Sequence, residues 1–313
     1  MIPKLEDIRL AYDRIKYQIH RTPILSSHSI NCISGANIVF KCENFQKVGA
    51  FKFRGASNAV LSLNDSEIGN GVATHSSGNH AQAIALAAKM RGIVAYIIMP
   101  DNSPQVKKDA VAGYDAQIIF CEPNLKAREI ALNKIVQKTN ATFIHPYNNF
   151  NVIAGQGTAA LELMEDIPDI DIIMTPVGGG GLLSGTAICA KSLNDNIQVI
   201  AGEPSGADDA YQSFKTGILQ ESTAPNTICD GLLTSLGSLT FEAVNLFVDD
   251  IYTVDDYYTI SAMKLIWERM KIIVEPSACV TLGAILKYKE KFEGKKVGII
   301  LSGGNLDLSK LPF

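Results

Sequence analysis

The stretch IDIIMTPVGGGGLLSGTAICAK, residues 170–191, decides the fold. Its mostly apolar first part leads into four consecutive glycines, Gly178, Gly179, Gly180 and Gly181, and a helix-forming segment follows them. A strand without regular polar alternation is typical of a parallel sheet covered on both faces. Backbone N–H groups at the start of the helix can surround a phosphate, whose charge the helix dipole favours. The stretch therefore predicts an α/β protein with a phosphate-binding turn between a strand and a helix.

Alternating strands and helices extend from this stretch in both directions. Apolar runs predict strands at residues 38–42, 71–75, 93–99, 117–121, 142–145, 170–177, 198–202, 251–254 and 297–301. Helical periodicity predicts helices at residues 52–63, 79–90, 104–111, 125–138, 153–164, 181–191, 207–215, 255–270 and 277–289. Such repetition is typical of parallel-rich sheets covered by helices. We predict that residues 71–148 form a small α/β domain inserted in a large domain of residues 1–70 and 149–313, with a ligand cleft between them.

The composition excludes several classes of protein. With 313 residues and 47% apolar residues, the chain is long enough for two domains with large cores, which excludes general disorder. Its 28 basic and 32 acidic residues give a net charge of −4, which argues against a nucleic-acid partner. The six cysteines lie far apart and predict reduced thiols, and the N-terminal segment predicts an amphipathic helix without a secretory signal. The uncharged run at residues 172–190 contains Pro176 and the glycines, which excludes a membrane span, so we expect a cytoplasmic protein.

The glycine loop differs from the common nucleotide-binding motifs. No Gly-Lys-Ser/Thr follows it, so it is not a Walker P-loop. It also lacks the G-x-G-x-x-G pattern with a later acidic residue that marks ribose binding. A phosphate site without a nucleotide signature indicates a phosphorylated cofactor. The simpler alternative is a flexible turn, for which one or two glycines would be enough.

A lysine in FQKVGAFKFRGASNA, residues 45–59, is a candidate for covalent chemistry. Lys52 stands between Phe51 and Phe53 at the start of a predicted helix. The ordinary alternative is an amphipathic lysine whose charged end reaches solvent. However, apolar neighbours and the positive end of a helix lower the pKa of an amine, and imine formation requires a neutral amine. We therefore predict an imine-forming role for Lys52.

The segment THSSGNHAQAIALAAK, residues 74–89, predicts an anion site at the N-terminus of an alanine-rich helix. Ser76, Ser77, Asn79 and His80 crowd the turn at the start of this helix. The alternative is simple helix capping, but capping needs only one such side chain. The size of the site suits a carboxylate.

A hydroxyl follows the last predicted strand. In LSGGNLDL, residues 301–308, Ser302 stands directly after that strand, where it can meet a ring nitrogen. Its alternative role is in a turn or a cap. An imine-forming lysine, a phosphate loop, a carboxylate site and a neutral ring partner together specify pyridoxal 5′-phosphate (PLP) and an amino-acid substrate.

The order and spacing of these segments resemble the fold-type II PLP enzymes of the serine/threonine dehydratase and serine racemase family, which have the tryptophan synthase β-like fold. The resemblance spans residues 22–305, from Thr-Pro to SGGN. It implies that Lys52 in FKFRGA carries PLP as an imine beside Phe51, and that the glycine loop holds the phosphate. It further implies that Asn79 bonds the phenolic oxygen and that Ser302 faces the pyridine nitrogen. The residues implied to hold the substrate carboxylate are Ser76, Asn79, His80 and Arg128.

The same resemblance implies an ammonia-lyase with serine racemase activity. Lys52 would remove the Cα proton, after which L-serine gives pyruvate and L-threonine gives 2-oxobutyrate, each with ammonia. Racemase-like members carry a second serine at the position of Ser77. On the side of the cofactor opposite Lys52, this hydroxyl can return a proton to Cα. The alternative is that Ser77 bonds only to the phosphate or to the backbone.

Three other functions remain open at this point. A threo-3-hydroxyaspartate dehydratase is similar to the chain at the same positions. A non-catalytic PLP- or nucleotide-binding module would keep the glycine loop but would need neither Lys52 nor Ser77. A cysteine-synthase-like enzyme of β-replacement uses the same scaffold, but its loops differ from the SSGNH form found here.

The acidic loop AGEPSGADDA, residues 201–210, is a candidate divalent-cation site. Oxygens of Glu203 and Asp209 and the carbonyl of Ala207 can bind Mg²⁺ or Ca²⁺, with waters completing the shell. An acidic loop is more often simply solvated, but the resemblance implies a cation at these positions.

The resemblance also bears on regulation and assembly. Racemase relatives bind a nucleotide at the subunit interface, where the corresponding regions here hold Ser27, His28, Lys47 and Tyr114. His28 and Val48 differ from the residues of the relatives, which argues against ATP as an effector. The chain ends soon after its last predicted strand, so we expect no amino-acid-sensing domain at its C-terminus. The family implies a homodimer.

Overall fold

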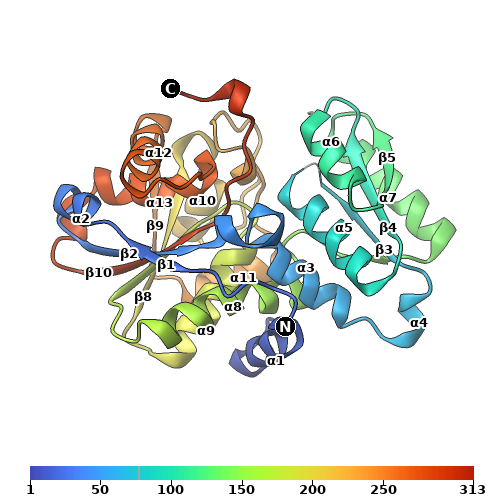
Figure 1. Cartoon of the computed structure of the whole chain (residues 1–313), viewed down its shortest axis with the longest axis horizontal. Helices are drawn as coiled ribbons and strands as arrows, with labels where there is room; N and C mark the ends of the chain where they lie inside the picture. Colours follow the sequence, from blue (N-terminus) through green and yellow to red (C-terminus); the bar gives the residue numbers. More distant parts are fainter. Residues whose placement is uncertain (77, 104) are drawn as a thin grey trace.

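The computed structural model describes residues 1–76, 78–103 and 105–313 of the chain, which form an α/β protein with two sheets (Figure 1). The larger sheet has six strands in the order β1-β2-β10-β7-β8-β9. β1 runs antiparallel to β2, and every other neighbouring pair in this sheet is parallel. Its strands are β1 (Ile24–Ser26), β2 (Asn37–Cys42), β7 (Ile172–Pro176), β8 (Gln198–Pro204), β9 (Asp250–Val254) and β10 (Lys296–Leu301).

The smaller sheet has four parallel strands in the order β5-β4-β3-β6. The chain builds it between β2 and β7 of the larger sheet, and Figure 1 shows it with its helices beside that sheet. Its strands are β3 (Val72–His75), β4 (Ala95–Pro100), β5 (Gln117–Cys121) and β6 (Thr142–Phe143). The exact boundaries of an inserted domain at residues 71–148 stay a prediction.

Helices cover both faces of both sheets. Five helices (α1, α8, α9, α10 and α11) share a core cluster on one face of the larger sheet, and α2, α12 and α13 share a cluster on the other. α3 and α5 pack with one face of the smaller sheet, whose other face packs against α7. The helices are α1 (Leu5–Ile15), α2 (His28–Ser34), α3 (Lys52–Leu61), α4 (Asp65–Ile68), α5 (Asn79–Arg91), α6 (Gln105–Ala112), α7 (Leu125–Thr139), α8 (Phe150–Asp166), α9 (Gly181–Leu193), α10 (Asp209–Thr216), α11 (Ser238–Phe247), α12 (Asp256–Met270) and α13 (Pro276–Lys287).

Each predicted strand and helix is present, with ends displaced by a few residues, and the structure adds several short elements. The additions are β1, α2, α4 and α11. β1 has three residues and α4 has four, which is too short for a hydrophobic period to show. α11 follows Gly237, which supplies no side-chain cap to mark the start of a helix.

Glycines let α8 lie directly against both α3 and α9. A Cβ atom on Gly155 of α8 would lie 2.6 Å from Cα of Gly55 in α3. A Cβ atom on Gly157 of α8 would lie 2.8 Å from the carbonyl oxygen of Gly185 in α9. Both distances are too short for a real side chain, so the helix backbones touch. α8 therefore holds together the helix that begins at Lys52 and the helix that begins at the glycine loop.

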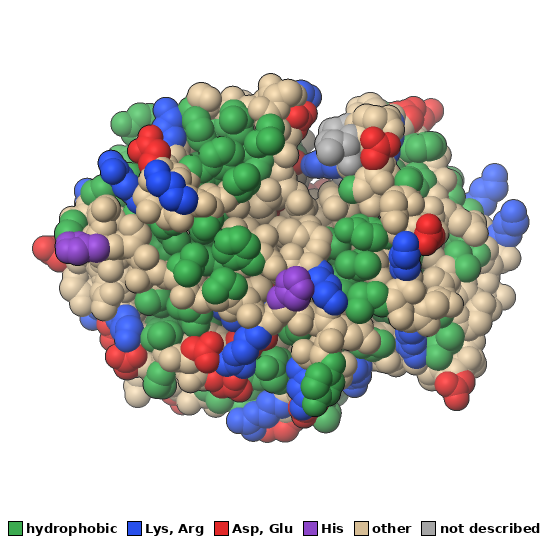
Figure 2. Space-filling view, in the orientation of Figure 1, with side chains coloured by type: hydrophobic (Ala, Val, Ile, Leu, Met, Phe, Trp, Pro, Cys, Tyr) green, Lys and Arg blue, Asp and Glu red, His purple; other side chains and the backbone are tan. Residues whose placement is uncertain are grey.

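The visible surface has mixed charge. Figure 2 shows basic and acidic side chains interspersed on this face, with a notch at its upper edge. No strong field of one sign is therefore evident on this face. Among the residues that the structure describes, no helix is both long and apolar enough to cross a membrane.

Candidate active site

A cavity of about 450 Å³ is lined by elements of both sheets. Its walls follow the carboxyl ends of parallel strands, with Ser76 after β3, Gly178 after β7 and Ser302 after β10. Loops converge at such ends, which is where α/β proteins usually bind ligands. The predicted site residues that line it are Phe51, Lys52, Ser76, Asn79, His80, Arg128, Gly178, Gly179, Gly180, Gly181 and Ser302.

The glycine loop leaves only backbone on one wall of the cavity. A Cβ atom on Gly179 would lie 2.2 Å from Cδ1 of Tyr147, and one on Gly178 would lie 2.9 Å from Cα of Leu232. Gly180 has a φ of +83°, a left-handed conformation that L-residues rarely adopt. No described side chain caps the start of α9 here. The first N–H groups of α9 are therefore available to an anion such as a phosphate.

Lys52 is the first residue of α3 and extends into the cavity. Its Nζ donates a hydrogen bond to the carbonyl oxygen of Pro146 at 3.0 Å and lies 5.2 Å from the centre of the Phe51 ring. Burial lowers the pKa of Lys52 to about 8, although the charge of Glu275 acts in the opposite direction. A much larger share of this amine is therefore neutral near pH 7.5 than for an ordinary lysine.

The start of α5 forms another part of the cavity wall. Gly78 precedes the helix, and no described side chain caps it, so its first N–H groups remain available. Ser76 Oγ accepts a hydrogen bond from the N–H of Gly78 at 3.3 Å. His80 is almost fully buried, with its Nε2 3.3 Å from the carbonyl oxygen of Ile144. Burial lowers the pKa of His80 well below its usual value, so the ring is neutral.

Asn79 is fixed by two neighbours that sequence reasoning did not identify as site residues. Its Nδ2 donates to both carboxylate oxygens of Glu275 at 3.1 Å, and its Oδ1 accepts from Nδ2 of Asn305 at 2.9 Å. The N–H of Asn305 donates to Glu275 at 3.2 Å. Burial raises the pKa of Glu275 to about 7. The only sequence signal for Glu275 was its place before Pro276, at the start of a helix.

Ser302 and Arg128 complete the predicted set. Ser302 is buried, and its carbonyl oxygen accepts the N–H of Phe51 at 3.0 Å, which ties the end of β10 to the turn before Lys52. Arg128 lies in α7, and its buried Nε has no hydrogen-bond partner among the described residues. Ser77, the predicted second proton carrier, lies outside the residues that the structure describes.

An ion pair spans the cavity. Lys107 of α6 forms an ion pair with Asp230, which begins a short 3-10 helix between α10 and α11. The two charged groups are 2.8 Å apart, and both residues line the cavity. α6 contacts β5 of the smaller sheet, and Cys229 and Leu232, on either side of Asp230, pack in a core of the larger sheet, so this pair connects elements of the two sheets.

The residues present fit PLP. The cofactor needs an amine for its aldehyde, donors for its phosphate and a partner for its ring nitrogen. Lys52, the uncapped start of α9 and Ser302 supply these groups around one cavity of suitable volume. A Cβ atom at Gly179 would collide with the ring of Tyr147. The loop therefore presents only backbone atoms to a ligand.

Comparison with known proteins agrees with this fit. The model of the family described as "Pyridoxal-phosphate dependent enzyme" matches residues 15–303. The chain belongs to this family. It is 52% identical over 311 residues to a serine racemase of Dictyostelium discoideum, covering 98% of this chain and 96% of that protein. It is 50% identical over 312 residues to a beta-hydroxyaspartate dehydratase of Paracoccus denitrificans, covering 100% and 99%. The structure of maize serine racemase matches with a TM-score of 0.97 at 46% identity, covering 99% of this chain and 95% of that one.

These matches confirm the predicted family, the fold-type II architecture and PLP as the cofactor. The chain is therefore a PLP-dependent enzyme whose relatives are racemases and ammonia-lyases. The individual roles of the residues in the cavity stay predictions, although the structure brings the described ones together.

The predicted cation site of this PLP enzyme contains two buried carboxylates. Glu203 accepts hydrogen bonds from the N–H groups of Ala210 at 2.9 Å and Tyr211 at 2.7 Å. Asp209 has one buried oxygen without a partner in the described part of the chain, and Ala207 is also buried. Burial raises the pKa of Glu203 to about 9 and that of Asp209 to about 6. No cluster of three or more His, Cys, Asp or Glu side chains suited to a metal occurs among the described residues, so a cation here would depend on carbonyls and water.

The residues of the predicted nucleotide region lie on separate elements. Ser27 caps α2, and the exposed His28 contacts Cys32 on the same helix, with 3.1 Å between Nδ1 and Sγ. Lys47 lies in the turn before α3, where its Nζ is 5.7 Å from the ring centre of Phe53. Tyr114 packs at the edge of the core that α3 and α5 share. The role of ATP stays an untested prediction.

Proposed function

We propose that this PLP enzyme is an ammonia-lyase for β-hydroxy amino acids that also racemises serine. L-Serine would give pyruvate and L-threonine would give 2-oxobutyrate, each with ammonia. The observation that carries the proposal is the position of Lys52, whose lowered pKa occurs in the cavity that also holds the glycine loop and Ser302. Relatives of both kinds, a serine racemase and a dehydratase, lie at 52% and 50% identity.

Each wall of the cavity supplies one part of the reaction. When bound, PLP withdraws electrons from the Cα of an attached amino acid and so weakens its Cα–H bond. Lys52, with its Nζ held by the carbonyl of Pro146, takes that proton as a neutral amine. The uncapped start of α5 holds the substrate carboxylate, beside the fixed amide of Asn79. Ser302 offers only a neutral hydroxyl, so it does not hold a proton on the ring nitrogen as a carboxylate would.

Racemisation requires a second proton carrier opposite Lys52. We assign this role to Ser77, whose neighbours Ser76 and Gly78 both line the cavity. Ser77→Ala should abolish formation of D-serine while pyruvate formation continues, as chiral chromatography and a 2-oxo-acid assay would show. Equal loss of both products would contradict the assignment.

One observation favours a second candidate substrate, threo-3-hydroxyaspartate. Arg128 faces the cavity with a buried Nε that has no partner among the described residues. A side-chain carboxylate would satisfy this guanidinium, while the α-carboxylate occupies the start of α5. Arg128→Gln should therefore reduce turnover of hydroxyaspartate far more than that of L-serine.

The test is a product assay on purified protein with PLP. L-Serine, L-threonine and L-threo-3-hydroxyaspartate are supplied separately, and 2-oxo acid, ammonia and D-serine are measured. We expect 2-oxo acid from these substrates and none from a Lys52→Ala variant. Full turnover by Lys52→Ala would overturn the proposal. Nucleotide binding without turnover would favour a non-catalytic module, and rapid conversion of O-acetylserine with sulfide would favour β-replacement.

We further propose a bound Mg²⁺ or Ca²⁺ at Glu203, Ala207 and Asp209, a cytoplasmic location and a homodimer. The buried unpartnered oxygen of Asp209 supports the cation, because a cation would offset the cost of its burial. Sedimentation velocity tests the dimer, and the effect of Mg²⁺ on the melting temperature tests the cation.

A further inference from the structure

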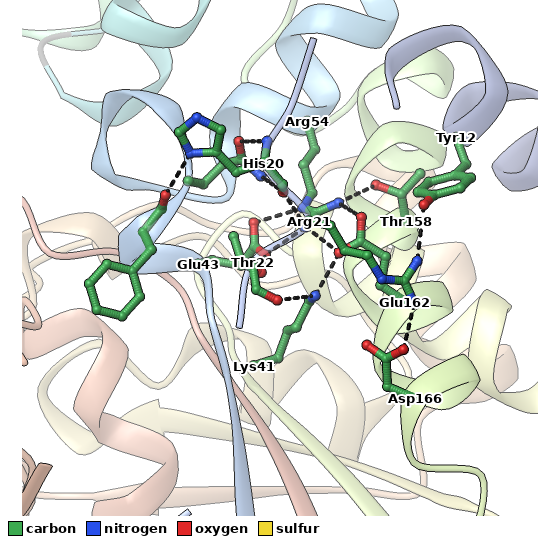
Figure 3. Close-up of polar contacts among 12 residues, drawn as sticks. Tyr12, His20, Arg21, Thr22, Lys41, Glu43, Arg54, Thr158, Glu162 and Asp166 are labelled. Atoms are coloured by element: carbon green, nitrogen blue, oxygen red, sulfur yellow. Dashed lines mark hydrogen bonds and ion pairs between the residues drawn. The ribbon is translucent and has the colours of Figure 1, made fainter. Parts of the chain in front are cut away.

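A cluster of four buried charges joins α3, the helix that begins at Lys52, to α8 and to the end of β2 (Figure 3). It consists of Lys41, Glu43, Arg54 and Glu162, each with no exposed surface. Two are positive and two are negative, so the cluster is neutral as a whole. Lys41 belongs to β2, and Glu43 begins the turn after it. Arg54 belongs to α3, and Glu162 belongs to α8. The proposed reaction uses none of these four side chains.

Arg54 is the centre of the cluster because it binds two carboxylates at once. Its Nε and Nη2 donate to Glu43 at 2.7 and 2.8 Å. Its Nη1 and Nη2 donate to Glu162, both at 2.8 Å. Nη1 also donates to Thr158 at 3.3 Å, which gives every N–H of the guanidinium an acceptor. A lysine cannot reproduce this planar, double two-point contact.

The cluster is satisfied around its edge as well. Lys41 Nζ donates to Glu162 at 2.6 Å and to the carbonyl oxygen of Thr22 at 2.8 Å. Thr22 Oγ1 donates to Glu43 at 2.6 Å. Buried ion pairs contribute little net stability compared with apolar packing, but they demand one geometry. A cluster of this kind therefore matters mainly for the geometry that it holds.

The position that it fixes is that of Lys52. Lys52 and Arg54 are two residues apart on α3, so their side chains leave the helix on opposite sides. Lys52 extends into the cavity, and Arg54 extends into the protein. Arg54 thereby fastens the first turn of α3 to α8, at Glu162, and to the end of β2, at Glu43.

The same helix, α8, also positions the glycine loop. α9, which begins at the loop, lies against α8 where Gly185 meets Gly157, and α3 lies against α8 where Gly55 meets Gly155. No side chain separates the three backbones at these points. The distance from Lys52 to the glycine loop is thus set by two direct backbone contacts and by the Arg54–Glu162 pair.

We propose that Arg54 is a positioning residue that sets the distance between the lysine and the phosphate site, so that both ends of PLP bind at once. The inference rests on the proposed function in taking Lys52 as the PLP-binding residue. Binding at two points is tight only when their separation matches the ligand, because the second contact then forms without further loss of freedom.

The experiment compares PLP with pyridoxal, which has the aldehyde but lacks the phosphate. Dissociation constants of the apoprotein for both are measured by absorbance and fluorescence titration. Arg54→Lys keeps the charge but loses the two-point contacts. We expect its preference for PLP over pyridoxal to fall about tenfold, because pyridoxal needs only the lysine. If Arg54 has only a structural role, Arg54→Lys should weaken the binding of PLP and of pyridoxal equally. The ratio of the two dissociation constants would then be unchanged.

Two control variants separate position from stability. Arg21→Lys alters an exposed arginine that pairs with Glu165 and Asp166 of the same helix α8 at 3.1 and 2.7 Å. Lys41→Met removes a buried charge that touches Glu162 but does not belong to α3. Both should keep the wild-type ratio, even if Lys41→Met melts at a lower temperature. A ratio that falls equally in Lys41→Met, or stays unchanged in Arg54→Lys, would overturn the proposal.

A second perturbation does not touch the charges. Gly155→Ala places a methyl group 2.6 Å from Gly55 and must push α3 away from α8, so the ratio should fall as in Arg54→Lys. This variant decides the question if Arg54→Lys does not fold. Borohydride reduction of the wild-type complex, followed by peptide mapping, shows separately whether PLP is attached at Lys52. Attachment elsewhere would overturn the proposed role of Lys52 and this inference together, whereas an unchanged ratio with attachment at Lys52 would overturn this inference alone.

Discussion

The pKa of Lys52 can be measured directly in the apoprotein. Burial lowers it to about 8, from an ordinary value of 10.5. At pH 7.5, an amine with a pKa of 8 is neutral about a quarter of the time, and one with a pKa of 10.5 only about a thousandth of the time. Lys52 should thus contain roughly 200-fold more of the reactive neutral form than an exposed lysine does.

Competitive labelling with acetic anhydride provides the assay, because only neutral amines react. The extent of acetylation of the peptide containing Lys52 is measured by mass spectrometry from pH 6 to 11, with the exposed Lys289 as an internal reference. The midpoint of the Lys52 curve should lie near pH 8. Limited access to the cavity lowers the rate at every pH but does not move the midpoint.

A substitution tests the cause of the shift. The negative charge of Glu275 raises the pKa of Lys52 against the effect of burial, so Glu275→Gln should move the midpoint further down. Asp230→Asn removes another carboxylate from the cavity wall and should leave the midpoint in place. A wild-type midpoint near pH 10.5, or an upward shift in Glu275→Gln, would refute the reasoning.

Three further predictions concern stability and ligand retention. Gly180→Ala should lower the free energy of unfolding in urea by about 1–2 kcal/mol and reduce the amount of PLP that the protein retains. The left-handed φ of +83° strains an alanine, and its Cβ would lie 2.6 Å from Cδ2 of Leu236. Gly217 has a similar φ of +68° but open space around it, so Gly217→Ala should lower stability and still retain PLP. Loss of PLP in this variant as well would contradict a specific role of the glycine loop. Glu275 has a folded pKa of about 7 against an ordinary 4.5, so its protonated form favours the folded state. The free energy of unfolding of the wild-type apoprotein, minus that of Glu275→Gln, should therefore fall by about 3 kcal/mol as the pH rises from 4.5 to 8. A difference that does not change with pH would be inconsistent with a raised pKa for Glu275. Mg²⁺ should raise the melting temperature more at pH 8 than at pH 6, because protons compete for the carboxylates, and Glu203→Gln should remove the effect; a response that survives in Glu203→Gln would place the cation elsewhere.

The strands were predictable because burial on both faces leaves a direct trace in the sequence. All five residues of β7 are buried, and its apolar run appeared without alternation. The glycine loop was predictable for a related reason, since four adjacent glycines have no use in an ordinary turn. By contrast, β1 is a three-residue antiparallel edge strand, and nothing in its composition distinguishes it from the loop around it.

The candidate site was predictable where one residue type at one position implied a chemistry. Lys52 between two aromatic rings and the polar turn before α5 gave such signals, and the structure places both at one cavity. Glu275 and Asn305 gave no such signal, because their role arises from contacts with Asn79 across 196 and 226 residues of chain. The charge cluster around Arg54 was hidden for the same reason. A charged residue in a helical segment is usually solvated, and only the fold shows that this one is fully buried.

The charges around the cavity also bear on the choice of substrate. Two histidines line the cavity, but burial lowers the pKa of His75 to about 4 and lowers that of His80 well below its usual value, so neither ring carries charge near neutrality. The positive charge of Lys107 is already paired with Asp230 at 2.8 Å. These three side chains therefore add little positive charge for an anionic substrate.

Arg128 differs from them, because its buried Nε has no hydrogen-bond partner and no salt bridge to it occurs among the described residues. The start of α5 can hold the α-carboxylate through backbone N–H groups without any formal charge. The guanidinium is then left for a second anionic group. A substrate with only one carboxylate would leave the buried Nε of Arg128 without a partner, which costs free energy. This difference predicts that turnover of a β-hydroxy dicarboxylic amino acid exceeds that of serine, and that Arg128→Gln reverses the order.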